Sequence, residues 1–498
     1  MKIRTSTRLR PAKARAKLLR RRRRIERRAT NWARGLELTT GITGLINAVG
    51  APLLRLLTER TGLRAELSQA LGALRPDFLP GHDRGQVLTD TAVAMVMGAV
   101  SVGGAAGTLG QCRAALGQVA SAPTIWRAIT EVDGQALETI AAVRAVHRRR
   151  IWQRLADRPE GFPWIEVAGR VWADWIVIDV DASLVETHSD KEGSAPTYKR
   201  HVYGLHPLLV TCANTGECLV AQLRAGNAGS NTVCDHVQAL TAAIAQIPEE
   251  HRQRIIFRAD GAGATKGLLE WIVAEAANHG YTWYYSVGFD VTEPVRQAIT
   301  EVPDRIWAAA LTPDNRIRRD AHVTEITGVL TLADGWPDGI RIMARTEPLH
   351  PRNRKQASPI ERERGQRFQA TATNLPGNHY PKLDAFHRNH AGVESIIKQG
   401  KDLGLRRMPG HAFAFNQTWC TLVALATDLV SWLRLLALDH HETLGKATPA
   451  LLRALILNVP ARVVHHARRR LIRIDDDHPH HADLTLAWTA IQALGTPP

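Results

Sequence analysis

The stretch Trp175-Ile-Val-Ile-Asp-Val-Asp181 is a short apolar run that ends in an acid. Its β-branched residues favour a buried strand, because branched side chains pack well on a pleated surface. A second run of this kind, Ile255-Ile-Phe-Arg-Ala-Asp260, also ends in aspartate. Because sites in open α/β sheets form beyond the carboxyl ends of the strands, we expect Asp181 and Asp260 to meet at one edge of a sheet.

The segments around these two runs alternate between strand and helix patterns. A hairpin signal surrounds the Asn214-Thr-Gly216 turn, since such residues join adjacent strands. The other elements are strands at Leu208–Cys212, Cys218–Leu223 and Tyr281–Val287, and helices at Asn231–Ile247 and Lys266–Ala277. The order of strand, strand, strand, helix, strand, helix, strand predicts an α/β fold of the ribonuclease-H-like type.

The charge of the chain is concentrated at one end. The 498 residues hold 64 Lys+Arg and 48 Asp+Glu, a net charge of +16. Residues 1–34 carry 15 of the basic groups and one acid, so they alone account for +14 and the remaining residues for +2. A polyanion, first of all nucleic acid, is the partner that this arm favours; the alternative is a solvated tail.

Cysteine content and hydropathy indicate the cellular compartment in which the protein works. Five cysteines make no disulfide framework, which fits a reducing, cytoplasmic location without a membrane partner. The uncharged stretch Thr91–Cys112 is rich in glycine and alanine. We interpret it as a buried helix followed by a Gly-rich turn rather than a membrane span.

These patterns divide the chain into six parts. The predicted parts are a basic disordered arm (1–35), an N-terminal all-α DNA-binding region with a candidate helix-turn-helix (36–165), the first part of the ribonuclease-H-like domain (166–289), a β-rich insertion (290–375), the second part of that domain with a helix carrying Glu394 (376–438), and a helical C-terminus (439–498). A plain helical bundle is an equally good interpretation of residues 36–165.

Three acids form the strongest candidate for chemistry. Asp181 and Asp260 close neighbouring strands, and Glu394 lies on a predicted helix. Three convergent carboxylates repel one another, so a hard cation such as Mg²⁺ is the physical resolution, and two ions can clamp the oxygens of a phosphodiester. For each acid alone, a helix cap or a surface salt bridge is the simpler interpretation. Asp179 has the same strand parity as Asp181 and is the alternative first acid.

Five segments then point to a known family: Val177–Ser183, Tyr203–Leu209, Leu223–Asn227, Arg258–Ala262 and Gly392–Lys398. Together they resemble a DDE-type insertion-sequence transposase with a β-rich insertion before the Glu, and most closely the insertion sequence 1380 family (transposase DDE domain group 1). The resemblance implies a ribonuclease-H-like catalytic domain in which Asp181, Asp260 and Glu394 are catalytic and hold two Mg²⁺ ions, with Mn²⁺ as substitute.

The same resemblance implies the reaction and the partners. It implies metal-dependent cleavage at transposon ends and strand transfer into target DNA. The partners would be the terminal inverted repeats and the target DNA, bound by a homo-oligomer on paired ends. The location would be the bacterial cytoplasm, with nucleoid association when bound. The alternative is a non-catalytic DNA-binding remnant or a repurposed transposase.

Two positions of the Glu helix depart from the family pattern. The family has a Tyr seven residues before the Glu, an Arg four before and a Lys seven after; this chain has His387, His390 and Lys401 there. The two histidines motivate the non-catalytic alternative. We expect both to bind DNA, His390 by donating to a phosphate when protonated or through one tautomer.

Basic residues around Glu394 complete the predicted DNA-binding surface. Residues 351–410 hold 12 Lys/Arg and five acids. Lys398, Lys401, Arg406 and Arg407 follow Glu394 within a few helical turns and are expected to contact phosphates. For Arg406 and Arg407 a solvated helix face is an equally good interpretation.

Other signals are weaker. Thr124, Trp126 and Arg127 are candidates for reading bases from the helical region. The pairs His440-His441 and His465-His466 are interpreted as surface helix residues. Asp475–His481 could bind metal, but a solvated loop is the favoured interpretation.

Overall fold

A computed structural model describes residues 43–75, 77, 80–187, 190–197, 202–229, 231–467 and 469–495, together with Arg20. The chain forms two units, Met1–Gly44 and Leu45–Pro498, and every element below belongs to the second. Apart from Arg20, the predicted basic arm (1–35) lies outside the described residues.

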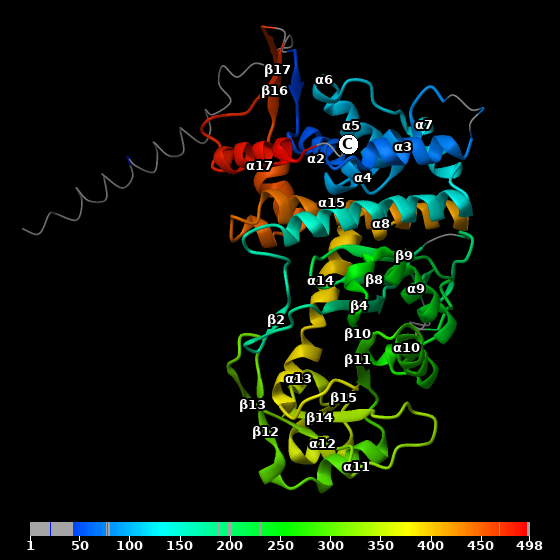
Figure 1. The fold of residues 1–498 in the computed structure, drawn as a ribbon, viewed down its shortest axis with the longest axis vertical. Helices are drawn as coiled ribbons and strands as arrows, with labels where there is room; N and C mark the ends of the chain where they lie inside the picture. The colour runs from blue at the N-terminus through cyan, green and yellow to red at the C-terminus, as the bar shows by residue number, and fades with distance from the viewer. Residues whose placement is uncertain are drawn as a thin grey trace, which may run out of the picture. The chain divides into compact units, whose positions relative to one another are not determined.

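A nine-stranded mixed sheet dominates the second unit (Figure 1). Its order is β12-β13-β14-β15-β11-β10-β4-β8-β9. β10 pairs in parallel with β4 and β11, and all other neighbours are antiparallel. The strands are β4 (Ile176–Ala182), β8 (Leu208–Cys212), β9 (Cys218–Gln222), β10 (Arg254–Ala259), β11 (Thr282–Phe289), β12 (Ala308–Leu311), β13 (Ile317–Glu325), β14 (Arg341–Pro348) and β15 (Gln366–Thr373).

The predicted succession of strands and helices is found along the chain. β4, β8, β9, α9 (Val233–Gln246), β10, α10 (Lys266–His279) and β11 follow in that order. Helices α9 and α10 lie on one side of these strands, and α13 (Tyr380–Arg388) and α14 (Ala391–Gly400) on the other (Figure 1). Because both faces are covered, the apolar run of β4 is buried from Ile176 to Val180.

Two small sheets were not predicted. They flank β4 in the chain and consist of β2 (Glu166–Val167) with β3 (Arg170–Val171), and of β5 (Val185–Glu186), β6 (Ala195–Pro196) and β7 (Tyr203–Leu205). Strands of only two or three residues leave too short an apolar pattern to be recognised in a sequence.

Strands from residues 290–375 extend the central sheet. β15 pairs with β11, and β14, β13 and β12 continue outward from it. Helices α11 (Glu293–Glu301) and α12 (Pro359–Arg364) accompany these strands. The segment predicted as an insertion is therefore continuous with the sheet that carries the two aspartates.

Helices fill the described part of the N-terminal region. They are α2 (Gly50–Arg60), α3 (Leu63–Ala73), α4 (Arg84–Val96), α5 (Val102–Gln111), α6 (Arg113–Leu116), α7 (Ala122–Thr130) and α8 (Gly134–Ala156). The prediction of a Gly-rich turn after α4 is wrong, because that stretch forms α5. The Ser101 hydroxyl caps α5 by accepting the Gly104 N–H at 3.1 Å, and Ala105 and Leu109 bury one face.

The longest helix of the described residues is α15 (Phe413–Ala437), which packs against α4, α8 and β9. It is long and apolar enough to cross a membrane, but 78% of its apolar window is buried inside the protein. A core helix of a folded domain has the same composition, and α15 has that position here, between the N-terminal helices and the sheet (Figure 1).

A buried ionic cluster joins α8, α15 and the β8–β9 turn. Arg144 and Arg148 of α8 both reach Asp428 Oδ2 of α15 at 2.8 Å. Arg148 also pairs with Glu217 at 3.0 Å, and Trp432 donates to the same carboxylate at 2.8 Å. With both acids fully buried, each charge depends on its partners for solvation.

The C-terminal region contains more than the predicted helices. Its helices are α16 (Pro449–Leu452) and α17 (His481–Ala493). A hairpin of β16 (Ala461–His466) and β17 (Arg469–Arg473) lies between them and pairs with β1 (Leu45–Ile46), a strand in the region predicted as all-α. His465 and His466 therefore lie on a strand, and the prediction of a helix there is wrong.

Replacing Asp428 by Asn tests the buried cluster. The change leaves Arg144 and Arg148 without a full counter-charge, and breaking a buried ion pair costs about 3–5 kcal/mol. We expect urea denaturation to give a free energy of unfolding lowered by that amount. The matched control is Arg149→Ala, which removes the exposed pair with Glu250 and should leave the unfolding midpoint unchanged. Equal midpoints for both variants would contradict the importance of the cluster.

Candidate active site

A buried ion pair links β4 to β10 below the predicted site. Asp179 faces Arg258 in the parallel register, and Arg258 donates from Nε and Nη2 to the two Asp179 oxygens at 2.7 and 2.9 Å. Arg258 Nη1 donates to the Phe386 carbonyl at 2.9 Å, which ties α13 to the sheet. Burial disfavours the Asp179 charge, but Arg258 and then His390 outweigh it, so the pKa of Asp179 is lowered.

The two strand-end acids lie one step beyond this pair. Asp181 and Asp260 stand two residues after Asp179 and Arg258, so by strand alternation they point to the same face. Asp181 is half-buried. Asp260 is exposed and accepts the Ala262 N–H at 2.9 Å, which caps the short turn at Gly261–Gly263.

Glu394 approaches from the first turn of α14. Helix α14 packs against β4 and β8, and α13 before it is held by Arg258. Asp181, Asp260 and Glu394 line one hollow of about 510 Å³, and Asp181 and Glu394 also line a second one beside it. The structure therefore brings together the three acids singled out by the sequence.

The three carboxylates of this hollow lie close enough to repel one another. Arg345 and Arg388, which also line it, are both paired with Asp384. Burial raises the pKa of Asp181 to about 6, and repulsion from Asp260 and Glu394 adds to the effect. A bound cation relieves both penalties, so the chemistry of these carboxylate donors fits a hard divalent metal ion.

Two histidines also line the hollow: His387 in the last turn of α13 and His390 directly before α14. His390 is buried and its Nδ1 lies 2.9 Å from Asp179. Because the ionised Asp179 carboxylate only accepts, Nδ1 carries the proton, and the buried Nε2 has no described hydrogen-bond partner. Burial lowers the pKa of His387 to about 3, so this ring is neutral and brings no charge to a phosphate.

Basic residues surround both hollows. Lys398 and Lys401 line the second hollow with Asp181 and Glu394. Arg406 and Arg407 are exposed but belong to neither lining, because the helix does not continue straight to them. Gly404 breaks it with φ of 117°, a conformation that other residues rarely adopt.

Sequence reasoning missed four residues of this region. Arg345, Arg367 and Arg388 line the first hollow and supply positive charge opposite the acids. Arg258, the residue that anchors the site, was seen only as part of a motif. A signal for it existed, because a charged residue precedes each strand-end acid by two positions, in Asp179-Val-Asp181 and in Arg258-Ala-Asp260.

The three candidates for base recognition in α7 differ in their exposure to solvent. Thr124 is buried and so is unavailable to DNA. Trp126 is 43% exposed, and its ring lies 4.3 Å from that of Phe415. Arg127 is exposed, and its Nε donates to the Pro123 carbonyl at 3.3 Å. Of the three, only Arg127 is both exposed and charged.

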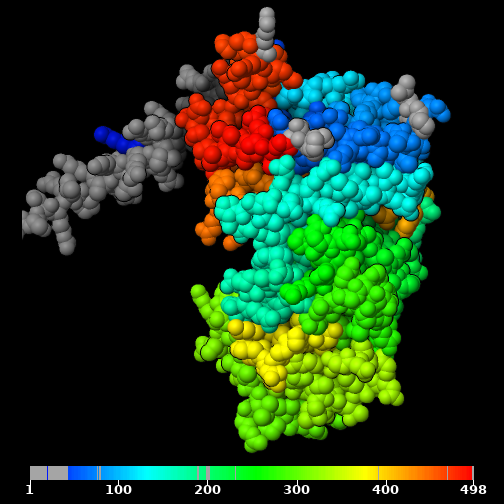
Figure 2. Space-filling model, in the orientation of Figure 1, coloured from blue at the N-terminus to red at the C-terminus, as the bar shows by residue number. Residues whose placement is uncertain are grey.

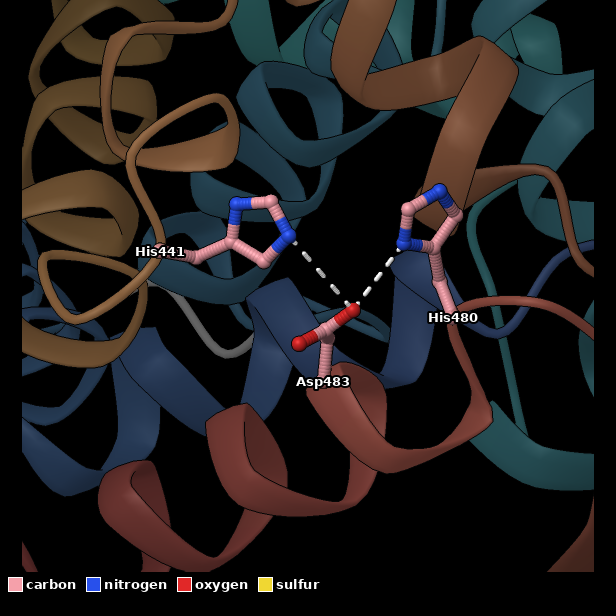
Figure 3. A group of neighbouring side chains, drawn as sticks. All are labelled: His441, His480 and Asp483. Carbon is pink, nitrogen blue, oxygen red and sulfur yellow. Dashed lines mark hydrogen bonds and ion pairs between the residues drawn. The ribbon is translucent and has the colours of Figure 1, made fainter.

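A second group of potential metal ligands lies at the start of α17 (Figure 3). His441 Nε2 and His480 Nδ1 face the same Asp483 oxygen, at 3.9 and 2.9 Å. His441 Nδ1, however, accepts the backbone N–H groups of Thr443 and Leu444 at 3.2 Å. Nε2 therefore carries the ring proton and is no ligand in this state, so the group acts as a polar link between α17 and the segment after α15.

The raised pKa of Asp181 predicts a pH dependence of stability. The folded, metal-free protein keeps a proton that the unfolded chain loses near pH 4, so this stabilisation is present below pH 4 and is lost as the pH rises through about 6. Between pH 4.5 and 7.5 in chelator, we expect the melting temperature of the wild type to fall relative to that of Asp181→Asn. Parallel melting curves for the two proteins over this range would contradict the shift.

The opposite environments of Asp179 and Asp181 predict opposite effects of mutation. Asp179→Asn leaves the buried Arg258 without a full counter-charge and should lower the free energy of unfolding by about 3–5 kcal/mol. Asp181→Asn removes a repelled carboxylate and should leave stability equal or higher at pH 7.5. Urea denaturation without metal measures both, and a larger loss for Asp181→Asn would reverse the roles given to the two acids.

The comparisons with known proteins give one family. No curated protein matches the chain. A family model, described as transposase DDE domain group 1, matches residues 42–496. Members of this family act on DNA and generally use divalent metal ions, which fits a hollow lined by three carboxylates. Because the match covers nearly the whole second unit and both aspartates and Glu394 lie inside it, the chain belongs to the transposase DDE domain group 1 family.

Proposed function

We propose that this transposase cuts DNA at the transposon ends and joins the resulting 3′-hydroxyl to target DNA, using two Mg²⁺ or Mn²⁺ ions held by Asp181, Asp260 and Glu394. The observation that carries the proposal is the convergence of Asp181, Asp260 and Glu394 on one hollow, where burial and mutual repulsion raise the pKa of Asp181. A divalent metal ion bound among the three carboxylates would relieve their mutual repulsion.

Each group around the hollow has a part in this reaction. When bound, the divalent ions supply Lewis acidity, which favours ionisation of water or of a 3′-hydroxyl and offsets the charge that develops on the phosphate. Asp179 and Arg258 act as positioning residues, because they fix the strand ends and α13. Lys398 and Lys401, beside Asp181 and Glu394, are suited to bind the phosphates that flank the scissile bond.

The fold supports the finer assignment of the catalytic domain. The run β9-β8-β4-β10-β11 has three antiparallel strands followed by two parallel ones, with helices on both faces. We assign this run to a ribonuclease-H-like core, and the strands from residues 290–375 to the insertion expected of the insertion sequence 1380 family. This assignment rests on the order and direction of the strands.

The remaining proposals concern partners and location. The terminal inverted repeats and target DNA would be bound by the basic arm, by the helical region 36–165 and by basic residues near Glu394. In the described state His390 does not donate to a phosphate, since Nδ1 is held by Asp179 and Nε2 is buried and unprotonated; a phosphate contact would require a protonated ring with Nε2 uncovered. We further propose a homo-oligomer on paired ends, acting in the bacterial cytoplasm and on the nucleoid.

Substitution of the acids tests the proposed function. The substrate is a duplex that carries the terminal sequences of the element encoding this chain. In Mg²⁺ or Mn²⁺, Asp260→Asn and Glu394→Gln should each lower end cleavage by about 10³-fold or more, because each loses a ligand that acts in the transition state. Gel analysis of labelled ends measures cleavage, and joining of labelled ends to a plasmid measures strand transfer.

The matched control is Glu270→Gln, an exposed acid on α10, which should keep full activity. Chelator should abolish the cleavage, and addition of metal should restore it. Full cleavage by Asp260→Asn or Glu394→Gln would contradict the proposal. A wild type that binds the ends tightly but never cuts them would identify a non-catalytic remnant instead.

A further inference from the structure

The C-terminal hairpin β16–β17 is unusually basic and exposed. Residues 461–473 contain five arginines, two histidines and no acid. Arg462, Arg469 and Arg473 are all exposed, as are His465 and His466. The hairpin and β1 project beyond the neighbouring helices (Figure 1), and the orange-red surface of the hairpin stands out in the space-filling view (Figure 2). None of the basic residues of the hairpin lines the two hollows of the active site.

The strand register brings two like charges together. Arg462 lies directly opposite Arg473, and at the other end of the hairpin Arg469 lies opposite His466. Like charges at directly opposed positions of an antiparallel pair destabilise the pair. Among the described residues, no acid forms an ion pair with Arg462, Arg469 or Arg473. A bound polyanion would therefore relieve the repulsion between Arg462 and Arg473.

Alternation along the strands places these charges on one face. Arg462 and His466 of β16 share a face with Arg469 and Arg473 of β17, and Leu45 of β1, which is 53% exposed, is paired with Arg462 on it. On the opposite face Ile46, Ala461 and Val463 are buried, while His465 and Arg470, nearer the tip, are exposed. The basic face therefore points away from the core.

The other face anchors the hairpin to the helical region. Arg470, on the packed side, donates from Nη2 to the carbonyls of Ala114 and Ala115 at 2.6 and 2.8 Å. These carbonyls lie on α6, whose C-terminal end favours a cation. Together with the pairing of β16 to β1, this contact holds the projecting ribbon in a defined position.

We propose that the outer face of β16–β17, with Leu45 beside it, is a binding surface for duplex DNA, in which Arg462, Arg469 and Arg473 contact phosphates. The inference rests on the proposed function, because it takes the polyanion of this protein to be DNA. A two-stranded ribbon has dimensions that fit the major groove. The two basic pairs lie four residues apart, about 13–14 Å, close to the groove width of about 12 Å. They can therefore reach phosphates on both sides of one groove.

The test is the salt dependence of DNA binding by the full chain. The variant Arg462→Ala/Arg469→Ala/Arg473→Ala is compared with wild type by fluorescence anisotropy on a labelled duplex at several salt concentrations. Each phosphate contact contributes about 0.9 to the slope of log K against log salt, so we expect a slope shallower by about 2.7. The contribution of the N-terminal arm is the same in both proteins and cancels in this difference.

Two further variants test whether the effect depends on the hairpin position or only on net charge. A melting temperature then tests whether the hairpin variant is folded. Arg462→Lys/Arg469→Lys/Arg473→Lys keeps the charges and should keep the slope. Arg305→Ala/Arg316→Ala/Arg319→Ala removes three exposed arginines around β12 and β13 and should change the slope by less than 1. The melting temperature of the hairpin alanine variant should be unchanged or raised, because the substitution removes repulsion.

An unchanged slope for the hairpin alanine variant, or an equal change in the β12–β13 control, overturns the proposal. Failure of the proposed function gives a different result. If wild type fails to cut DNA with metal while the hairpin variant still loses slope, the hairpin is a DNA surface and the enzymatic assignment is wrong. If cutting occurs and the slope does not change, the hairpin proposal alone fails.

Discussion

The ion pair between Asp179 and Arg258 is the constraint on which the site depends. Both side chains are almost fully buried, so the pair is stable only because every charge has partners: two oxygens for the guanidinium, and Arg258 and His390 for the carboxylate. The same guanidinium holds the Phe386 carbonyl, and its charged carbon lies 5.0 Å from the Phe386 ring centre. One side chain thus sets the alignment of two strands and the seat of α13, and α13 leads directly into the helix that carries Glu394.

The two aspartates of β4 show how position on one strand decides chemistry. Asp179 sits among cations and is held ionised, whereas Asp181, two residues further on, is half-buried beside two other acids and resists ionisation. Environments that push the pKa values of neighbouring acids apart are a mark of functional sites. The charge of Asp179 is neutralised within the chain by Arg258. The repulsion between Asp181 and the other two acids would instead be relieved by a bound cation.

Much of this architecture could be predicted from the sequence. The β-branched runs that end in Asp181 and Asp260 indicated the two strands β4 and β10, which lie side by side in the sheet. The choice between Asp179 and Asp181 could not be made, because both have the same strand parity and only tertiary contacts distinguish them. Helix α5 was missed since glycine disfavours helices, although Ser101 caps it and its apolar residues recur at helical spacing. The β16–β17 hairpin was missed because its arginines hide the alternation of Val463 and Ile472 with exposed positions.

The central claim is that Asp181, Asp260 and Glu394 form a site for divalent metal ions, and the most direct measurement is anomalous scattering from crystals of the protein soaked in Mn²⁺. The account predicts anomalous peaks within coordination distance of these carboxylates, where Asp181 and Glu394 divide the two hollows. It also predicts that the peaks disappear in Asp181→Asn crystals treated in the same way. Peaks only at other places, such as the group of His441, His480 and Asp483, or no peak at all at saturating Mn²⁺ and pH 7.5, would contradict it.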